Sequence, residues 1–226
     1  MLSFRALGPL EICCDGITHR VTGSFRITLL GALLFSTSPI PPRVLSEELW
    51  GSGGSGHNQN SLHAHISRMR QMLRELEPDR PESRIVYSPD SGYSLSTRDE
   101  DVDFRVFATE VECLAHDNGL CGKEPEIVRR LRSVLAAWRG PLLGGIVGGP
   151  ICQGAAAHYT GLRLRCLERL FEAELACGNH AGIIPELSAF VETYTPSVVR
   201  SSAYPSWLIV TGAPKRIPCI GRLVSP

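Results

Sequence analysis

One stretch of the chain has the period of a single amphipathic helix, and it constrains the fold more than any other. It runs from Asn60 to Leu76, and its apolar side chains recur at offsets of four, three, four and three: Leu62, Ile66, Met69, Leu73 and Leu76. This spacing places them in one stripe along a helix. The stretch is therefore predicted to be a helix that packs against the rest of the chain by this stripe.

The opposite face of the same helix is polar and basic, with no acidic residue before Glu75. Its members are Asn60, His63, Ser67, Arg68, Arg70, Gln71 and Arg74. Side chains of these types bind base edges and phosphates when a helix lies in the major groove of DNA. The same pattern also fits an ordinary solvated face, so the surrounding elements have to decide between the two interpretations.

Residues 1–22 are predicted to form a small antiparallel sheet. Apolar residues alternate with polar ones on both sides of Gly8-Pro9, and the alternation continues after Asp15-Gly16. An Asp-Gly pair between two alternating runs is a strong signal for a tight hairpin.

Two helices are expected between this sheet and the amphipathic helix. The first extends from about Ser24 to Ser36, with Gly23-Ser24 offering the N-cap. The second begins near Pro42, because proline is favoured in a first helical turn, and ends in Trp50. Trp50 is interpreted as a core residue.

A β-hairpin is predicted after the amphipathic helix. Residues 85–87 and 93–95 read as strands, and Pro89, Asp90 and Gly92 mark a reverse turn between them. Tyr93 is expected to pack under this hairpin. The order sheet, helix, helix, loop, helix, hairpin is that of a winged helix, whose third helix is placed to enter DNA.

Six motifs follow one another across the chain: FRALGPLEI (4–12), ELWG (48–51), SLHAHISRMRQML (61–73), SGYSL (91–95), DVDFRVF (101–107) and AAWRGPLL (136–143). In this order they resemble the Streptomyces antibiotic regulatory proteins, and residues 1–97 resemble the OmpR-type winged-helix domain. The resemblance implies a pathway-specific activator of secondary-metabolite genes. Its partners would be double-stranded promoter DNA with direct repeats and RNA polymerase holoenzyme, and a homodimer on DNA is a candidate state.

The fold class expected is an α+β winged helix-turn-helix domain followed by an all-α, tetratricopeptide-like helical domain. The winged helix occupies residues 1–97, and 98–192 resemble the bacterial transcriptional activator domain, in incomplete form. In this second part helices are expected from Asp103, from Pro125, from about Ala155 to Cys177, and from Ile183. Residues 193–226 contain no acidic residue and five prolines, so an irregular tail outside the family pattern, shortened or out of frame, is expected.

The resemblance and the spacing together give the candidate site. The DNA-binding residues are the polar face of the amphipathic helix together with Arg84, Ser91 and Gly92 at the hairpin. The loop equivalent to a polymerase-contact loop contains Gly51, Gly53, Gly56 and His57. Phosphate contacts would set the register on DNA and base contacts would carry the sequence preference.

Other chemistries fit the chain less well. The string GSGGSG at 51–56 matches a dinucleotide fingerprint, but that site needs a preceding strand and here a helix precedes it. The histidines at 57, 63 and 65 form no helical i, i+4 pair, and the eight cysteines form no C-x-x-C motif and are interpreted as reduced core residues. The acidic run 99–103 is interpreted as a solvated linker. We therefore expect no metal, no cofactor and no enzymatic activity.

The formal net charge is zero, so DNA binding would have to come from a local face. Residues 1–98 contain ten arginines against nine acidic residues. This balance leaves open the alternative of a protein-interaction module, and the incomplete helical domain leaves open a DNA binder that lacks activation. No apolar run reaches a membrane-spanning length and no signal-peptide pattern is present, so a cytoplasmic, nucleoid-associated protein without a membrane partner is expected.

Overall fold

The computed structural model describes residues 2–51, 59–116, 124–179 and 182–186. The chain divides into two compact units. The first comprises Met1–Asp117 and Arg132–Cys166, and the second comprises Asn118–Leu131 and Leu167–Pro226. Each unit is described by itself.

The first unit begins with the predicted antiparallel sheet. Strands β1 (Leu2–Arg5), β2 (Glu11–Cys14) and β3 (Ile17–Arg20) pair in this order. Asp15 and Gly16 join the last two strands with φ angles of 48° and 84°, the positive values that a two-residue hairpin turn requires. The sheet and its turn are therefore confirmed.

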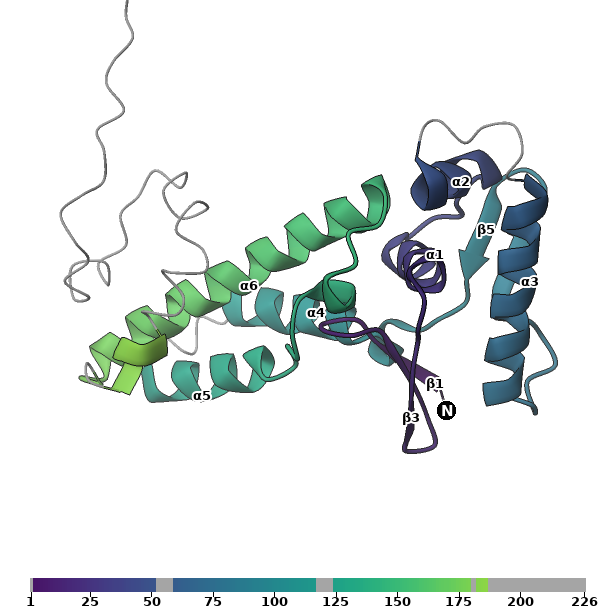
Figure 1. Ribbon diagram of the computed structural model, residues 1–226. Helices are drawn as coiled ribbons and strands as arrows, with labels where there is room; N and C mark the ends of the chain where they lie inside the picture. Colours follow the sequence, from purple (N-terminus) through teal and green to yellow (C-terminus); the bar gives the residue numbers. More distant parts are fainter. Residues whose placement is uncertain (1, 52–58, 117–123, 180–181, 187–226) are drawn as a thin grey trace, which may run out of the picture. The chain divides into compact units, whose positions relative to one another are not determined.

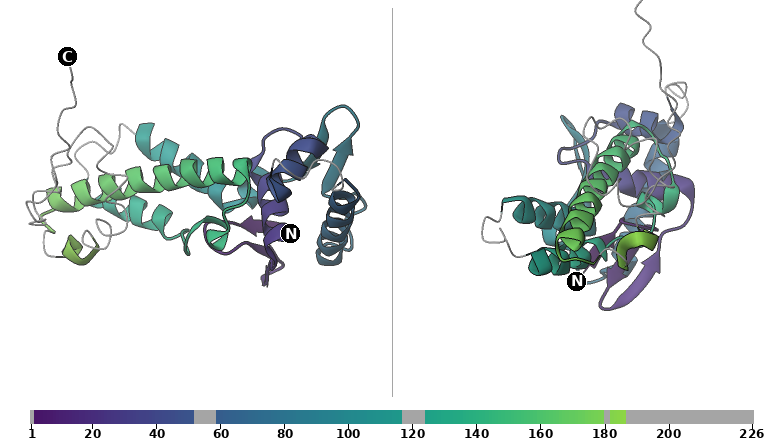
Figure 2. Two further views of the ribbon diagram at one scale, coloured as in Figure 1. Left: turned by 45° about the horizontal axis from the view of Figure 1, so that its top comes forward. Right: turned by 90° about the vertical axis from the view of Figure 1, so that its left-hand side faces the viewer.

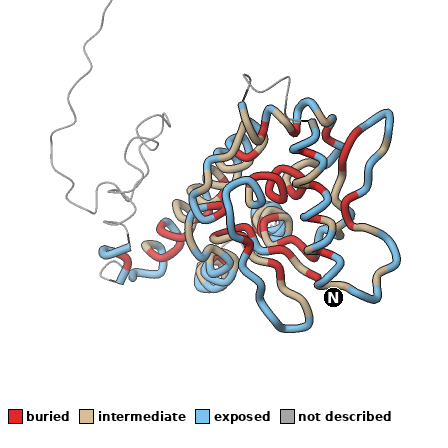
Figure 3. Tube along the Cα trace, turned by 45° about the vertical axis from the view of Figure 1, so that its right-hand side comes forward, coloured by how far each residue is buried: buried red, intermediate tan, exposed pale blue. Residues whose placement is uncertain are grey.

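Three helices follow, at nearly the predicted positions: α1 (Ser24–Phe35), α2 (Pro42–Trp50) and α3 (Gln59–Leu76). Pro42 lies in the first turn of α2, as expected. Gly23 occupies the N-cap position of α1 without any side-chain cap hydrogen bond. Four members of the predicted stripe of α3 are at most 3% exposed: Leu62, Ile66, Met69 and Leu73. The colouring of Figure 3 shows such buried positions gathered inside the N-terminal part.

The wing is a hairpin of β4 (Ile85–Ser88) and β5 (Gly92–Leu95), as predicted. Tyr93 exchanges two backbone hydrogen bonds with Ile40, at N···O distances of 2.7 and 2.9 Å, and so joins β5 to the segment before α2. Gly92 has a φ of +108°, and a Cβ atom there would overlap the carbonyl oxygen of Ile40. Only glycine fits this position without moving the backbone.

The helical part contains the 3-10 helix η1 (Asp99–Asp101), α4 (Asp103–His116), α5 (Glu124–Leu135), the short η3 (Leu142–Gly145) and α6 (Pro150–Ala176). Phe104 and Phe107 on α4 are buried, as are Leu170 and Phe171 on α6. The helix α6 begins at Pro150 rather than at about Ala155. Residues 182–186 are helical as well. The predicted tail 193–226 lies outside the described residues.

The amino-terminal segment of the first unit is bonded to the start of α4. The carboxylate of Asp103 accepts hydrogen bonds from the backbone N–H groups of Ala6 (2.8 Å) and Leu7 (3.0 Å). Burial raises the pKa of Asp103, and these hydrogen bonds and the nearby Arg139 oppose that rise. The Arg139 N–H donates to the carbonyl oxygen of Leu7 at 2.7 Å, and Leu143 N–H donates to Ala6 at 3.0 Å.

The interpretation of 99–103 as a solvated linker is wrong for part of the run. Asp99 and Glu100 have exposed side chains (84% and 68%), as a linker would. Asp101 is buried and accepts two hydrogen bonds of 3.0 Å from the guanidinium of Arg98, and Asp103 binds the amino-terminal segment. A buried carboxylate needs such donors: Asp101 finds them in Arg98, three residues earlier, and Asp103 in Ala6 and Leu7, almost a hundred residues earlier.

The helix α6 is capped by a side chain from α2. The Glu48 carboxylate is buried and accepts hydrogen bonds from the backbone N–H groups of Gly149 (2.9 Å), Ile151 (2.8 Å) and Cys152 (3.0 Å). The first N–H groups of a helix have no partner within the helix and attract negative charge. Glu48 therefore fixes the start of α6 to the winged-helix part of this unit.

Of the six described cysteines, only Cys152 and Cys166 are buried, so the expected core role fits just these two. No group of His, Cys, Asp or Glu suited to a metal ion occurs among the described residues. Within the same residues, no helix is both long and apolar enough to cross a bilayer.

Candidate nucleic-acid interface

The outer face of α3 is the solvent-exposed polar face that the sequence predicts. In Figures 1 and 2 the helix stands at the edge of the N-terminal part, beside the wing strand β5 in Figure 1. Six of the seven predicted side chains on this face are exposed: Asn60, His63, Ser67, Arg68, Gln71 and Arg74. We call these six residues the reading face. Gln71 donates a hydrogen bond to Glu75 at 3.0 Å, the one acidic neighbour that the sequence places at the end of this helix.

Arg70 is the seventh, and its side chain turns toward the wing instead. Its Nε donates to the carbonyl oxygen of Ile85 at 3.0 Å, and its guanidinium carbon lies 5.9 Å from the centre of the Tyr93 ring. Arg70 is half-buried in this position. We therefore correct its assignment from DNA contact to a residue that holds α3 and the wing together.

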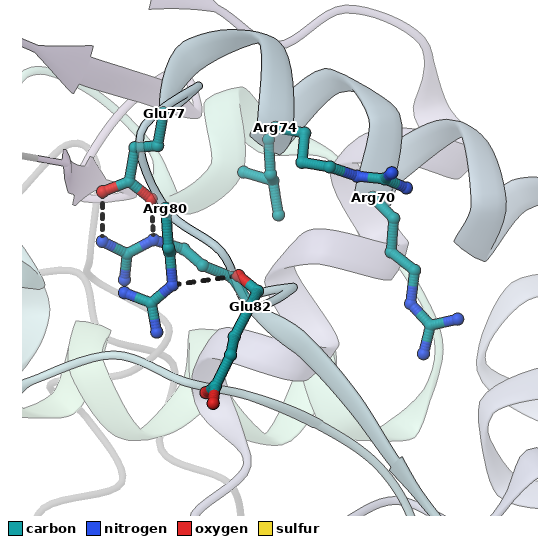
Figure 4. A pocket seen from close by; sticks show the side chains of 7 residues that line it. Arg70, Arg74, Glu77, Arg80 and Glu82 are labelled. Atoms are coloured by element: carbon teal, nitrogen blue, oxygen red, sulfur yellow. Dashed lines mark hydrogen bonds and ion pairs between the residues drawn. The ribbon is translucent and has the colours of Figure 1, made fainter.

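Arg84 is buried, which also removes it from the predicted DNA surface. Its guanidinium donates to both carboxylate oxygens of Glu77, from Nε and from Nη2, and to the carbonyl oxygen of Ser96 at 2.8 Å. Figure 4 shows this ion pair, with the guanidinium groups of Arg70 and Arg74 directed away from Glu77. Three of the five N–H groups of the Arg84 guanidinium donate within the protein, and the side chain is buried.

At the wing, Gly92 is buried and has the packing role described above, so its assignment as a DNA contact is corrected too. Ser91 remains exposed at the hairpin turn. The Tyr93 side chain is 5% exposed and packs on Tyr87, with 4.8 Å between ring centres, which confirms the packing interpretation. Burial raises the pKa of the Tyr93 hydroxyl.

A basic depression next to the reading face was not predicted. It has a volume of about 330 Å³ and is lined by Gly23, Ser24, Phe25, Arg26, His65 and Arg68. The His65 ring stacks on Phe25 at 5.5 Å and lies 6.0 Å from Trp50, which is half-buried rather than fully in the core. Burial, Arg68 and Arg26 all lower the pKa of His65. The sequence carries no local signal for this site, because Arg26 and Arg68 meet only through packing of α1 on α3.

Comparison with known proteins identifies the chain's relatives. The sequence model of the bacterial transcriptional activator domain matches residues 102–195. The transcriptional regulator RedD of Streptomyces coelicolor is 32% identical over 195 residues, which are 85% of this chain and 55% of RedD. The regulatory protein DnrI of Streptomyces peucetius is 28% identical, over 83% of this chain and 70% of DnrI. The chain is therefore similar to Streptomyces regulatory proteins, and residues 102–195 match the bacterial transcriptional activator domain.

Mycobacterial proteins are also similar to this chain. The transcriptional regulatory protein MoaR1 of Mycobacterium bovis is 29% identical over 84% of this chain and 61% of its own length. The solved structure of Mycobacterium tuberculosis EmbR in complex with a low-affinity phosphopeptide superposes with a TM-score of 0.71 at 26% identity. The superposition covers 86% of this chain and 51% of the EmbR chain. The chain spans less than two thirds of the length of MoaR1, RedD and EmbR.

The loop that the resemblance leads us to expect at a polymerase contact lies mostly outside the described residues. Gly53, Gly56 and His57 fall within 52–58, so their prediction has no structural outcome. Gly51 is described: it follows the last turn of α2, is exposed, and has a φ of +77°.

The Glu77–Arg84 pair should make the stability of the protein depend on pH. Hydrogen bonds from Arg84 hold the pKa of Glu77 below its ordinary value of 4.5. The stabilisation is therefore present above that ordinary value and is lost as the pH falls through the lower pKa of the folded state. We expect the free energy of unfolding, measured by urea denaturation from pH 7 downward, to fall less steeply in Arg84→Met than in the wild type.

The matched control for this prediction is Arg43→Met. Arg43 is 85% exposed and pairs only loosely with Glu47 (3.7 Å), so its removal should leave the pH dependence unchanged. Equal slopes for Arg84→Met and the wild type would contradict the prediction, whatever the loss of stability at pH 7.

Proposed function

We propose that the chain is a sequence-specific DNA-binding activator of transcription whose helix α3 enters the major groove of promoter DNA. The observation that carries the proposal is the reading face, where six polar or basic side chains are exposed opposite a stripe with four of its five members buried. A helix presented in this way by a helix-turn-helix and followed by a wing is the standard arrangement for major-groove recognition. The names of the relatives, which are transcriptional regulators, support the same function.

Within the reading face, roles divide by chemistry. Arg68 can bind guanine by two hydrogen bonds, whereas Asn60 and Gln71 have the amide groups that pair with adenine. Arg74, nearer the end of α3, and Ser91 on the wing are placed to meet the phosphate backbone. Arg70 contributes indirectly, because its hydrogen bond to Ile85 sets the angle between the helix and the wing.

The remaining parts of the proposal concern partners and the helical region. We infer that promoter direct repeats bind the winged helix, as a homodimer or as successive copies, and that RNA polymerase is recruited. Residues 1–97 and 98–192 would be the two functional domains, the second with tetratricopeptide-like helical hairpins. The match to the bacterial transcriptional activator domain at 102–195 supports this division.

The test is base preference in the variant Arg68→Ala. A lost bidentate contact costs about 1–3 kcal/mol and relaxes preference at one base position. We therefore expect weaker binding to a site selected in vitro from a random-sequence duplex library, with one position of that site becoming degenerate. Reselection with the variant, together with gel-shift affinities, measures both effects.

The control is Arg20→Ala, because Arg20 is exposed on β3 in the other sheet of this unit. Its affinity and selected sequence should match those of the wild type. If the wild type bound no DNA duplex at any salt concentration but formed a stable complex with a protein, the interaction-module alternative would replace the proposed function.

A further inference from the structure

We propose that Arg26, on α1, is a further DNA-contacting residue: it binds one backbone phosphate of the DNA strand that borders the groove in which the neighbouring Arg68 contacts a base. This inference rests on the proposed function and adds to it a residue outside the recognition helix. The site is the basic depression described above, lined by Gly23, Ser24, Phe25, Arg26, His65 and Arg68.

The first observation is the uncompensated positive charge. Both guanidinium groups lie close enough to His65 to lower its pKa, so Arg26, Arg68 and His65 share one small region. Neither arginine has a carboxylate partner among the residues that the structure describes. The first turns of α1 and α3 contain no acidic residue either. Like charges brought together in this way repel one another, and an anion placed between them removes the repulsion.

The second observation is the shape of the region. A depression of about 330 Å³ is large enough for a phosphate group, and it opens to solvent beside the exposed Arg68. Phe25, 41% exposed, forms an apolar wall that can pack against a deoxyribose. The first turn of α1 has no side-chain cap on its backbone N–H groups, and these add donors and a favourable dipole to the two arginines.

The position of Arg68 identifies the source of the phosphate. Arg68 belongs both to this depression and to the reading face of α3. When that face meets base edges, the strands that border the groove bring phosphates to its flanks. A free phosphate ion or a phosphopeptide offers the same charge, but neither engages the rest of the reading face. DNA can place a phosphate in the basic depression and base edges against the reading face at the same time.

His65 gives the site an independent reporter. The groups that face its ring are Phe25 and Arg26 from α1, Trp50 from α2 and Arg68 from its own helix. A bound phosphate would offset the two arginine charges and raise the pKa of His65. DNA binding should then take up a proton, and the affinity should rise as the pH is lowered from 8 to 6.

The experiment compares Arg26→Ala, Arg26→Lys and the control Arg20→Ala on a fluorescent 30-base-pair duplex carrying the in vitro selected site. Loss of one phosphate contact should weaken binding of Arg26→Ala about three- to tenfold at low salt and reduce the slope of log K against log salt by about 0.9. The selected base sequence should stay unchanged. Arg26→Lys should keep the wild-type slope, and histidine NMR titrations should show the His65 pKa rising with duplex in the wild type but much less in Arg26→Ala.

The outcomes separate this inference from the proposed function. If the wild type binds the duplex and Arg26→Ala has the same affinity and salt slope, the phosphate site is overturned while the recognition role of α3 stands. If the wild type binds no duplex, the proposed function itself fails. If a phosphopeptide or inorganic phosphate shifts His65 at micromolar concentration and the duplex does not, the assignment to DNA is overturned. Circular dichroism melting of each variant checks that the exposed substitution leaves the fold intact.

Discussion

Replacing Glu48 with glutamine is expected to lower the free energy of unfolding by about 3 kcal/mol. The carboxylate is buried and each of its oxygens accepts backbone N–H groups at the start of α6. Glutamine keeps one oxygen but turns an NH2 group toward an N–H donor. It also removes the negative charge from a helix amino terminus. Urea denaturation measures the loss, and faster hydrogen exchange at the amides of Ile151 and Cys152 would locate it.

The neighbouring residue supplies the control for this substitution. Glu47 is half-exposed and lies 3.7 Å from Arg43 in a surface pair, so Glu47→Gln should change the stability by at most about 0.5 kcal/mol. A loss below 1 kcal/mol in Glu48→Gln, with unchanged amide exchange at α6, would mean that the cap contributes little.

Gly92→Ala is expected to destabilise the protein by about 3–5 kcal/mol and to weaken DNA binding as well. The added methyl group meets the backbone of Ile40 and Pro41, which cannot yield as a flexible side chain would. Relief of the clash has to separate β5 from Ile40 and break the hydrogen bonds of 2.7 and 2.9 Å that Tyr93 makes there. The wing would then move relative to α3. Thermal melting and gel-shift affinity measure the two effects.

Gly16→Ala separates backbone strain from the clash. Gly16 also has a positive φ, +84°, but no atom lies within 4 Å of the added Cβ position. Its substitution should cost only the conformational strain, about 1 kcal/mol. Similar losses in the two variants would show that contact with Ile40 is unimportant.

Periodicity predicted the fold of the first unit well, because the elements there are short and their signals are local. The stripe of α3 is buried where four- and three-residue spacing places it, and the Asp15-Gly16 turn has the expected positive φ angles. Burial and exposure on opposite sides of one helix follow from the sequence alone. The prediction of an exposed polar face on α3 was correct for six of its seven side chains.

The errors concern charged side chains whose partners are set by the folding of loops and by packing rather than by helix or strand periodicity. Arg84 meets Glu77 across a loop, and Arg70 meets Ile85 in the wing, so both are removed from a surface that sequence spacing alone would give them. Asp103 likewise looks like a helix cap in a linker but binds residues ninety-six and ninety-seven positions earlier. The sequence shows which residues are charged. Tertiary packing decides whether their side chains face water or form ion pairs with one another.

The cap on α6 also restricts how related regulators can recombine. An exchange of residues 1–97 between two relatives would place Glu48 of one protein against the α6 amino terminus of another, and Ala6 and Leu7 against a foreign Asp103. Each mismatch leaves buried polar groups without partners. Exchange of the reading face of α3 touches none of these contacts. If α3 reads DNA as proposed, we expect new operator preferences to arise by substitutions within Gln59–Leu76 more readily than by exchange of whole amino-terminal segments.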